Sequence, residues 1–541
     1  MSQSRSPSGS DSELAYITRS VLRRKRQSRA HTTTKSNSST ESDSDVSKST
    51  GILFTIKSYV QPTDGENQSL SSKLVESILV LFPVALAIWC VPELADYSQT
   101  LDTLAVLCGV ILLPYFGVKG FSHIILYKFA LPMVVSLSSL PSDLPLNLLI
   151  TLTALPVPNL FLPLLILPFI KYLDLSEPIL LGWWVDLFMK DLCLIIKWLC
   201  DGSLTETEVW LFAALATNVI LVDSRFSVGS YIQCLTLACF VTFVPLVPLF
   251  EKIIRISKRI GPKRKGKEKA KLAAARKIYI LAPIFGVVVS SALLHVHGES
   301  LWSLFVYICT FYHFKILAYW FGVLAVVIPL VLLTSSSWTL DFRRKAWHAC
   351  IVLMFIPVGT NCDAEFTSLS ISVAFILFIV LEIVRATALP PLGVAIHKTL
   401  ENFTDERDTC GPIIVSHIFL LLGIGLPIIL AHSPAGIICL GLGDASASIV
   451  GRHFGRLHLF GSKKTLEGTV AFTIGSLVGL SVCKYIIPSY SRFETLSCVG
   501  MLITAFSTAL LEATSGMNDN VIVPIYMMVI LELCLKSDII I

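Results

Sequence analysis

Charge is scarce in this sequence, because Asp, Glu, Lys and Arg together make up only 15% of its residues. A soluble globular protein carries about a quarter charged residues, whereas here 54% of the residues are hydrophobic. The shortage of charge therefore excludes an ordinary soluble domain and predicts a polytopic membrane protein. Backbone groups in lipid must be satisfied internally, so long apolar runs are typical of helices rather than of a barrel.

The sequence also lacks the cysteine spacings of metal and redox sites. Its 14 cysteines are scattered, mostly inside apolar runs, and no Cys-x-x-Cys occurs. This pattern indicates neither a zinc site nor a disulfide framework. We expect no N-terminal signal peptide either, because the first apolar stretch begins only near Leu74.

The net charge of +5 comes from a single segment. Residues 252–277 hold twelve Lys and Arg and one acidic residue, and acidic residues outnumber basic ones in the rest of the chain. Such a run can bind nucleic acid, but beside a membrane span it is typical of a cytoplasmic loop that contacts anionic lipid. We therefore expect no nucleic-acid partner.

Apolar runs of helical length predict an all-α polytopic membrane bundle of about 15–17 transmembrane helices. The run at 143–172 contains Pro156 and Pro158, and is either one bent helix or a tight pair. In chain order, the predicted parts are a disordered Ser/Thr-rich cytoplasmic tail (1–72), an N-terminal transmembrane region (73–251), a basic cytoplasmic loop (252–277), connecting transmembrane spans (278–340) and a C-terminal transmembrane region that carries the polar clusters (341–541).

Span parity predicts that the polar clusters of the last third lie on one side of the membrane. If the basic loop is cytoplasmic, successive pairs of spans return residues 341–345, 385–411, 452–468 and 513–518 to the cytoplasm. The short loops between them carry acids or little charge, as the positive-inside rule expects. We therefore expect one cytoplasmic site built from several loops.

Two polar clusters precede the most informative one. Lys345 and His348 are three residues apart and share a helix face, although basic residues beside a span can simply set its orientation. Asp405 and Asp408 lie just before the span that opens near Gly411, and can converge as oxygen ligands for Mg²⁺. The alternative for this pair is an acid cluster that caps a helix.

The richest cluster lies at 441–468. Close helix packing explains the small residues around Asp444. It does not explain Asp444 itself, because placing a carboxylate at a membrane boundary costs free energy, and such an acid is a default functional candidate. The loop that follows, 452–468, contains Gly-Ser-Lys-Lys-Thr at 461–465 and then Glu467. It is not a Walker A motif, because Gly461 is followed by Ser rather than Lys. A Gly- and Lys-rich loop beside an acid indicates a polyphosphate site with its metal.

These residues resemble the CTP-binding signature of the dolichol kinases. The resemblance covers about 340–530 and takes in Arg344–His348, Pro390–Gly393, 405–412, 443–468, Leu511-Glu512 and 518–524. The Gly-Asp and Lys-Thr-x-Glu-Gly elements also resemble CDP-diacylglycerol synthases, which use CTP too. The resemblance therefore implies CTP more firmly than it implies the reaction.

Resemblance to the dolichol kinases implies transfer of the γ-phosphate of CTP to dolichol. The product, dolichyl phosphate, is the lipid carrier for protein glycosylation, including N-glycosylation, and is formed at the cytoplasmic face of the endoplasmic reticulum membrane. The partners implied are a dolichol or polyprenol lipid, CTP and lipids of that membrane, with a divalent cation, Mg²⁺, as cofactor. The sequence says nothing about protein partners.

The resemblance also implies roles for individual residues of the catalytic region 341–541. The residues expected in catalysis are Lys345, His348, Asp405, Asp408 and Asp444. The residues expected to bind CTP are Arg452, Arg456, Gly461, Ser462, Lys463, Lys464, Thr465, Glu467 and Gly468. The residues expected to hold the metal are Asp408, Asp444 and Asp519. Which acid acts as base and which binds metal stays open.

Two other classes of protein stay open as alternatives. A cytidylyltransferase similar to CDP-diacylglycerol synthases would release pyrophosphate from CTP and a lipid phosphate. A polytopic transporter would also have many spans, proline-broken helices and intramembrane acids, but transporters often show internal repeats and ion sites near the midplane. No clear repeat is present here, and the acids cluster at span ends on one side.

Overall fold

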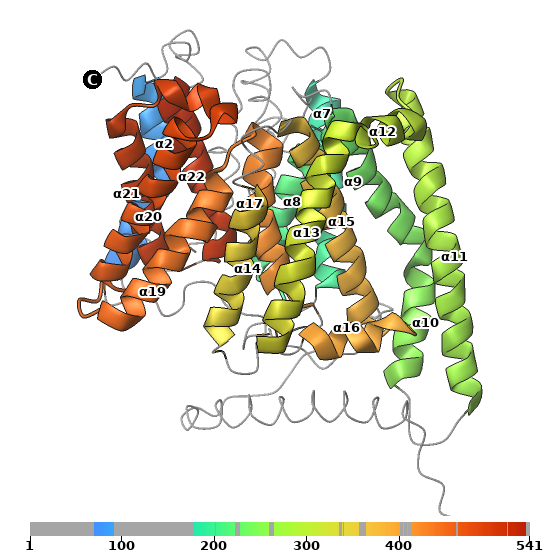
Figure 1. The fold of residues 1–541 in the computed structure, drawn as a ribbon. Helices are drawn as coiled ribbons and strands as arrows, with labels where there is room; N and C mark the ends of the chain where they lie inside the picture. The colour runs from blue at the N-terminus through green and yellow to red at the C-terminus, as the bar shows by residue number, and fades with distance from the viewer. Residues whose placement is uncertain are drawn as a thin grey trace, which may run out of the picture.

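The computed structural model shows a helical bundle, which confirms the predicted fold class (Figure 1). The residues that the structure describes are 70–90, 178–200, 202–221, 228–258, 265–334, 338, 340–355, 364–400, 404, 408, 411, 413–460, 462, 464–516 and 518–536. Within these ranges the β structure is limited to one isolated bridge between His458 and Thr465.

The helices before the last third are long and follow one another closely. They are α2 (Leu70–Cys90), α7 (Pro178–Leu199), α8 (Glu206–Leu221), α9 (Gly229–Phe243), η3 (Val244–Leu246), α10 (Val247–Lys258), α11 (Lys265–Val296), α12 (Leu301–Ile308) and α13 (Phe311–Thr334).

The last third adds shorter and more irregular helices between its spans. They are α14 (Leu340–Phe355), α15 (Ala364–Ala386), α16 (Leu392–Leu400), α17 (Ser416–Ala431), α18 (Ala435–Ile437), η8 (Ile438–Asp444), α19 (Ala445–Phe454), α20 (Leu466–Tyr485), η9 (Pro488–Thr495), α21 (Cys498–Thr514) and α22 (Asp519–Lys536).

Among the described residues, six helical segments are long and apolar enough to cross a membrane. They are Gly229–Ile253, Lys269–Val296, Phe311–Thr334, Ala364–Ala386, Ala435–Phe454 and Leu466–Tyr485. Each overlaps a span predicted from the sequence. The run at 143–172, much of the rest of the predicted N-terminal transmembrane region and nearly all of the tail 1–72 lie outside the described residues, so the total of 15–17 spans stays a prediction.

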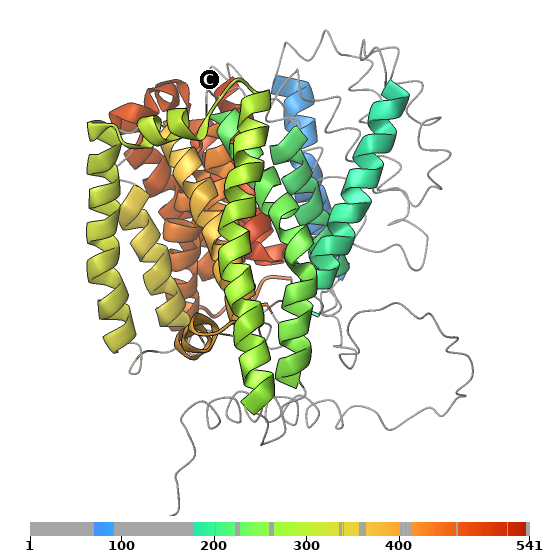
Figure 2. The ribbon, with the colours of Figure 1, turned by 90° about the vertical axis from the view of Figure 1, so that its right-hand side faces the viewer.

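The predicted basic loop is largely helical. Helix α10 continues the preceding span as far as Lys258, and α11 begins at Lys265. The second half of the segment is rich in Lys and Ala, both strong helix formers, which explains why the helix extends beyond the apolar run. Figures 1 and 2 show both helices extending beyond the rest of the bundle at one end.

Several polar helix ends lie at that same end of the bundle. Figure 1 shows that α14 begins there, that α15 ends there, and that the connection from α19 to α20 lies there. The start of α2 is tied to the α21–α22 connection, because Ser72 Oγ donates to the Thr514 carbonyl oxygen (3.0 Å) and the Glu76 carboxylate accepts the Gly516 N–H (3.1 Å). This arrangement agrees with the convergence that span parity predicts.

Helix α22 lies at the centre of the C-terminal bundle. Its apolar residues between Val521 and Leu533 are almost completely buried, as expected for a helix that is hydrophobic on every side. Helices α2, α17, α18 and α21 pack around it. Its buried Glu532 forms an ion pair with Arg492 of η9 at 2.9 Å, so the acid has a counter-charge. This packing fixes the first turn of α22, which carries Asp519.

Glycines allow two of these helices to approach closely. A Cβ on Gly423 of α17 would lie 1.9 Å from the backbone oxygen of Asn520 in α22. A Cβ on Gly441 of η8 would lie 2.1 Å from Cγ2 of Val352 in α14. Only glycine fits either contact, and small residues at helix interfaces are typical of membrane bundles.

We expect Gly423→Ala to destabilise the protein, because the added methyl group overlaps backbone atoms of α22. Overpacking of this kind costs about 1–3 kcal/mol, so the melting temperature of the detergent-purified protein should fall. Gly322→Ala on α13 is the matched control, since a Cβ there meets no atom within 4 Å. Equal melting temperatures for the two variants would contradict this account of the α17–α22 contact.

Candidate functional site

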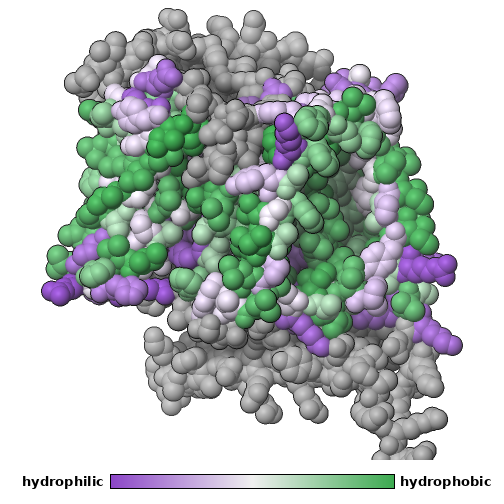
Figure 3. Space-filling view, in the orientation of Figure 1, coloured by the Kyte–Doolittle hydropathy of each residue, from purple (hydrophilic) through white to green (hydrophobic). Residues whose placement is uncertain are grey.

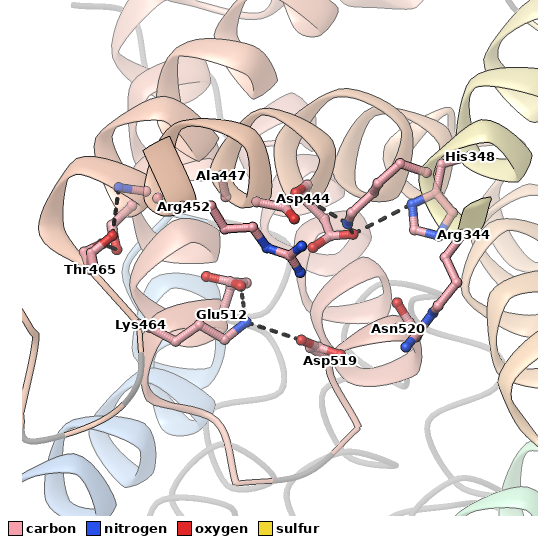
Figure 4. Close-up of a pocket in the computed structure, with 15 residues that line it drawn as sticks. Arg344, His348, Asp444, Ala447, Arg452, Lys464, Thr465, Glu512, Asp519 and Asn520 are labelled. Carbon is pink, nitrogen blue, oxygen red and sulfur yellow. Dashed lines mark hydrogen bonds and ion pairs between the residues drawn. The ribbon is translucent and has the colours of Figure 1, made fainter. Parts of the chain in front are cut away.

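A polar cavity of about 330 Å³ lies where α14, α19, α20, α21 and α22 come together. Figure 4 shows charged side chains from these helices directed toward a common space. The lining residues are Arg344, Lys345, His348, Asp444, Ala447, Ser448, Gly451, Arg452, Lys464, Thr465, Gly468, Thr469, Glu512, Asp519 and Asn520.

The π-helical segment η8 places Asp444 in this cavity. Asp444 is the last residue of η8, where it joins α19, and π-helical segments occur frequently at functional sites. Gly443 allows η8 to lie against α20, because a Cβ there would be 2.9 Å from Ser476 Oγ. Beyond the junction, the Ser446 hydroxyl donates to the Ala471 carbonyl oxygen of α20 at 3.0 Å. The backbone around Asp444 is thus held against α20.

Asp444 is paired with two side chains from α14. Its carboxylate forms an ion pair with the Lys345 ammonium, which also donates to the Asp444 carbonyl oxygen at 3.3 Å. His348 Nδ1 lies 3.4 Å from Asp444 Oδ2 and 3.0 Å from the Leu440 carbonyl oxygen. Because both oxygens only accept, the geometry assigns a proton to Nδ1. The three residues therefore form one network between α14 and η8.

A second charged group faces the first across the cavity. The Lys464 ammonium forms an ion pair with Glu512 at the end of α21 and lies 3.2 Å from Asp519 Oδ2 at the start of α22. Burial alone would lower the pKa of Lys464, but the negative charges of Asp519 and Glu512 hold that pKa above its ordinary value. Lys464 therefore stays positively charged throughout the physiological pH range.

The loop between α19 and α20 is folded as a tight hairpin, which positions Lys464. The Leu459 N–H donates to the Lys464 carbonyl oxygen (3.0 Å), and the Leu466 N–H donates to the Leu457 carbonyl oxygen (2.8 Å). Thr465 caps α20, since its hydroxyl oxygen accepts the Gly468 N–H at 3.3 Å. These backbone contacts explain how Lys464 is directed into the cavity.

Glu467 stabilises this hairpin instead of lining the cavity. Its carboxylate accepts the backbone N–H of Arg456 at 3.1 Å and that of Leu457 at 3.3 Å. An acid in the first turn of α20 is also favoured by the helix dipole. The contact expected between Glu467 and the nucleotide stays a prediction.

The structure brings together many of the residues predicted for the site. Those that line the cavity are Lys345, His348, Asp444, Arg452, Lys464, Thr465, Gly468 and Asp519. Those that do not line it are Asp408, Arg456, Ser462 and Glu467. Asp405, Gly461 and Lys463 lie outside the described residues.

Asp408 caps a helix, which is the alternative role that the sequence left open for it. Its Oδ1 accepts the backbone N–H of Val415 (2.9 Å) and of Ser416 (3.1 Å). Its Oδ2 accepts the Ser416 hydroxyl at 2.7 Å. The buried carboxylate therefore holds the start of α17, and the catalytic and metal-binding roles expected for it stay predictions.

Seven lining residues were not assigned to the site from the sequence: Arg344, Ala447, Ser448, Gly451, Thr469, Glu512 and Asn520. Arg344 and Glu512 both belong to motifs that the sequence comparison with dolichol kinases singled out. Glu512 also carries a physical signal, because an acid at the end of a long apolar run is a default functional candidate. Its side chain is 6% exposed and is paired with Lys464.

The carboxylates of the cavity are of the kind that bind Mg²⁺ when a bound substrate supplies the remaining ligands. Among the residues described, no group of three or more His, Cys, Asp or Glu could hold a metal on its own. Mg²⁺, however, is usually bound through one or two carboxylates, water and substrate phosphates. Glu512 and Asp519 both reach the same Lys464 ammonium, so they can also reach a shared cation.

The sequence is similar to several dolichol kinases. It is 31% identical to the dolichol kinase of Saccharomyces cerevisiae over 347 residues, which span 62% of each chain. It is 37% identical to that of Schizosaccharomyces pombe over 211 residues, 37% of this chain and 40% of the relative. It is 34% identical to that of Homo sapiens over 242 residues, 40% of this chain and 44% of the relative.

These matches confirm the resemblance seen in the motifs, and the chain is related to the dolichol kinases. The chain spans less than two thirds of the length of these relatives. No family model matches the chain. No solved structure matches it either.

We expect Glu467→Ala to loosen the α19–α20 hairpin, because the N–H groups of Arg456 and Leu457 lose their acceptor. Limited proteolysis should then cut within 455–462 faster than in the unmodified protein. Glu467→Gln keeps an amide oxygen at the same place and should be cut at nearly the original rate. Equal cleavage of the Ala variant and the unmodified protein would show that Glu467 does not stabilise the hairpin.

Proposed function

We propose that this relative of the dolichol kinases phosphorylates dolichol, with CTP as the phosphoryl donor. The observation that carries the proposal is the cavity, which gathers four cations and three carboxylates from five helices and the α19–α20 connection at the polar end of membrane spans. The cations are Arg344, Lys345, Arg452 and Lys464. Phosphoryl transfer depends mainly on positioning and on stabilisation of charge, and this arrangement can supply both.

The phosphates of the donor would lie against Lys464 and Arg452. Lys464 is directed into the cavity by the hairpin, and Arg452 approaches from the last turn of α19. Two cations from different elements can hold a polyphosphate in one orientation. The assignment of CTP in particular rests on the similarity of 443–468 to the dolichol kinase signature, since the cavity alone does not distinguish one nucleoside triphosphate from another.

The hydroxyl of the acceptor would lie near Asp444. The γ-phosphorus forms a bond to the hydroxyl oxygen while its bond to the bridging oxygen of CTP breaks, which gives dolichyl phosphate and CDP. Asp444 is the candidate to accept the hydroxyl proton, since its carboxylate lines the cavity. Lys345 and His348 hold that carboxylate in place.

A divalent cation, Mg²⁺, would be held by Asp519 and Glu512, with Asp444 as a further oxygen ligand. When bound, Mg²⁺ would neutralise negative charge on the phosphates. The Lys464 ammonium, which contacts both Glu512 and Asp519, can turn toward the phosphates once a metal balances these acids. Asp408 is not included, because its oxygens cap α17.

The membrane provides the setting for the reaction. The chain is a multi-pass membrane protein, and we infer that it resides in the endoplasmic reticulum with its site facing the cytoplasm. The basic helix ends of α10 and α11 lie at the same end of the bundle as the site (Figures 1 and 2), which supports a cytoplasmic site through the positive-inside rule. The product would serve as the lipid carrier for protein glycosylation.

The direct test is a product assay on the purified protein with γ-labelled CTP, dolichol and Mg²⁺. The proposal predicts labelled dolichyl phosphate and unlabelled CDP in equal amounts, with ATP a poor donor. Release of pyrophosphate from CTP and a lipid phosphate would instead indicate a cytidylyltransferase. A protein that leaves CTP intact when dolichol is present would overturn the proposal.

We expect Lys464→Ala and Asp444→Asn to lose ~10²-fold or more in kcat/KM, the usual effect of removing a preorganised charged group. Arg276→Ala is the matched control, because Arg276 is an exposed cation of α11 outside the cavity. Each variant should be purified and its melting temperature compared before the assay. Near-normal activity in both site variants would contradict the assignment.

A further inference from the structure

The cavity is bounded on one side by two helices that do not pack along one another. Helix α14 packs against η8, and α19 packs against α20, whereas α14 and α19 are not closely packed against one another. Figure 1 shows the two ribbons diverging from the level of η8 toward the polar end of the bundle. Within the part of the chain that the structure describes, the side of the cavity between α14 and α19 therefore lacks the tight helix packing found on its other sides.

The cavity wall on these helices is continuous with their outer surface. On α14, Lys345 and His348 line the cavity, and Ala349, four residues after Lys345, is exposed. On α19, Ser448 lines the cavity, and the next residue, Ile449, is 53% exposed. Successive residues are about 100° apart around a helix, so the outer surface begins immediately beside the charged wall.

The outer surface beside the opening is apolar. On α14, Phe342, Ala349 and Leu353 fall on one face of the helix by their spacing, and Phe342 and Leu353 are 54% and 52% exposed. Ile449 of α19 is exposed as well. Figure 3 shows hydrophilic atoms set back between the hydrophobic surfaces of these helices. Among the described residues, a polar recess between α14 and α19 is therefore framed by exposed apolar side chains.

The opposite wall of the cavity is closed by protein. Glu512 of α21 and Asn520 of α22 line it and are 5% and 6% exposed, and α22 behind them is the buried centre of the bundle. A hydrophobic chain cannot enter from that direction. The connection between α19 and α20 contributes Lys464 to another wall of the cavity, and this charged group suits a nucleotide.

We propose that the acceptor lipid enters this cavity sideways from the bilayer, between α14 and α19. Its hydrocarbon chain lies against Phe342, Ala349, Leu353 and Ile449, and its terminal hydroxyl reaches the Lys345–Asp444 pair. Moving such a chain through water is unfavourable by about 0.8 kcal/mol for each CH₂ group, so an entrance from the bilayer avoids that penalty. This inference rests on the proposed function, since it takes the acceptor to be a long-chain polyprenol alcohol.

Photo-crosslinking tests the entrance without relying on catalysis. A benzophenone amino acid is introduced in place of Ala349 or Ile449 in the full chain, in membranes that contain an alkyne-tagged polyprenol. The control position is Ile474, which is 57% exposed on α20 and does not line the cavity. We expect stronger labelling at 349 and 449 than at 474, with the excess removed by untagged polyprenol. Equal labelling at the three positions would mean contact with bulk lipid only and would overturn the proposal.

A variant that blocks the entrance distinguishes the failure of this proposal from the failure of the proposed function. Ala349→Trp should raise the KM for the polyprenol by about tenfold while the KM for CTP and the binding of CTP stay unchanged. Val478→Trp on α20, 54% exposed in the unmodified protein, should change neither. If Ala349→Trp leaves the KM for the polyprenol unchanged while CTP-dependent phosphorylation persists, the entrance is wrong and the proposed function stands.

Discussion

A carboxylate near the hydrocarbon of a membrane needs a counter-charge, and this requirement organises the C-terminal bundle. Asp444 is paired with Lys345, which lies 99 residues earlier in the chain, and Glu512 and Asp519 share Lys464. Removing one partner of such a pair leaves an uncompensated charge, which is strongly destabilising. The ion pairs that link α14 to η8, and the hairpin to α21 and α22, are therefore also contacts that form the cavity.

The sequence predicted the helical class and the convergence of the polar clusters because both depend on composition along the chain. Apolar run length sets the number of residues in each span, and span parity then places every second connection on one side. Lys345, Asp444 and Lys464 were accordingly expected at a common site, and the structure brings them together. The motif resemblance added CTP as the expected nucleotide, which charge and spacing do not indicate.

The individual roles of the acids could not be predicted in the same way. Asp408 and Glu467 both lie in motifs beside a span, yet one caps α17 and the other accepts hydrogen bonds from the hairpin backbone. Glu512, which lies in an apolar helix, faces the cavity instead. Whether an acid faces the cavity or a helix end depends on how each helix is rotated and where its neighbours cross it, and these are properties of the tertiary packing.

The central claim is that the two charged groups, Lys345–Asp444 and Lys464–Glu512–Asp519, flank a bound nucleotide and its metal. The most direct measurement is an experimental structure of the protein with Mg²⁺ and a CTP analogue whose β–γ linkage cannot be cleaved. The account predicts that the terminal phosphates lie between Lys464 and Asp444, with the metal on Asp519 or Glu512. A nucleotide bound elsewhere, with both ion pairs unchanged and the cavity empty, would contradict it.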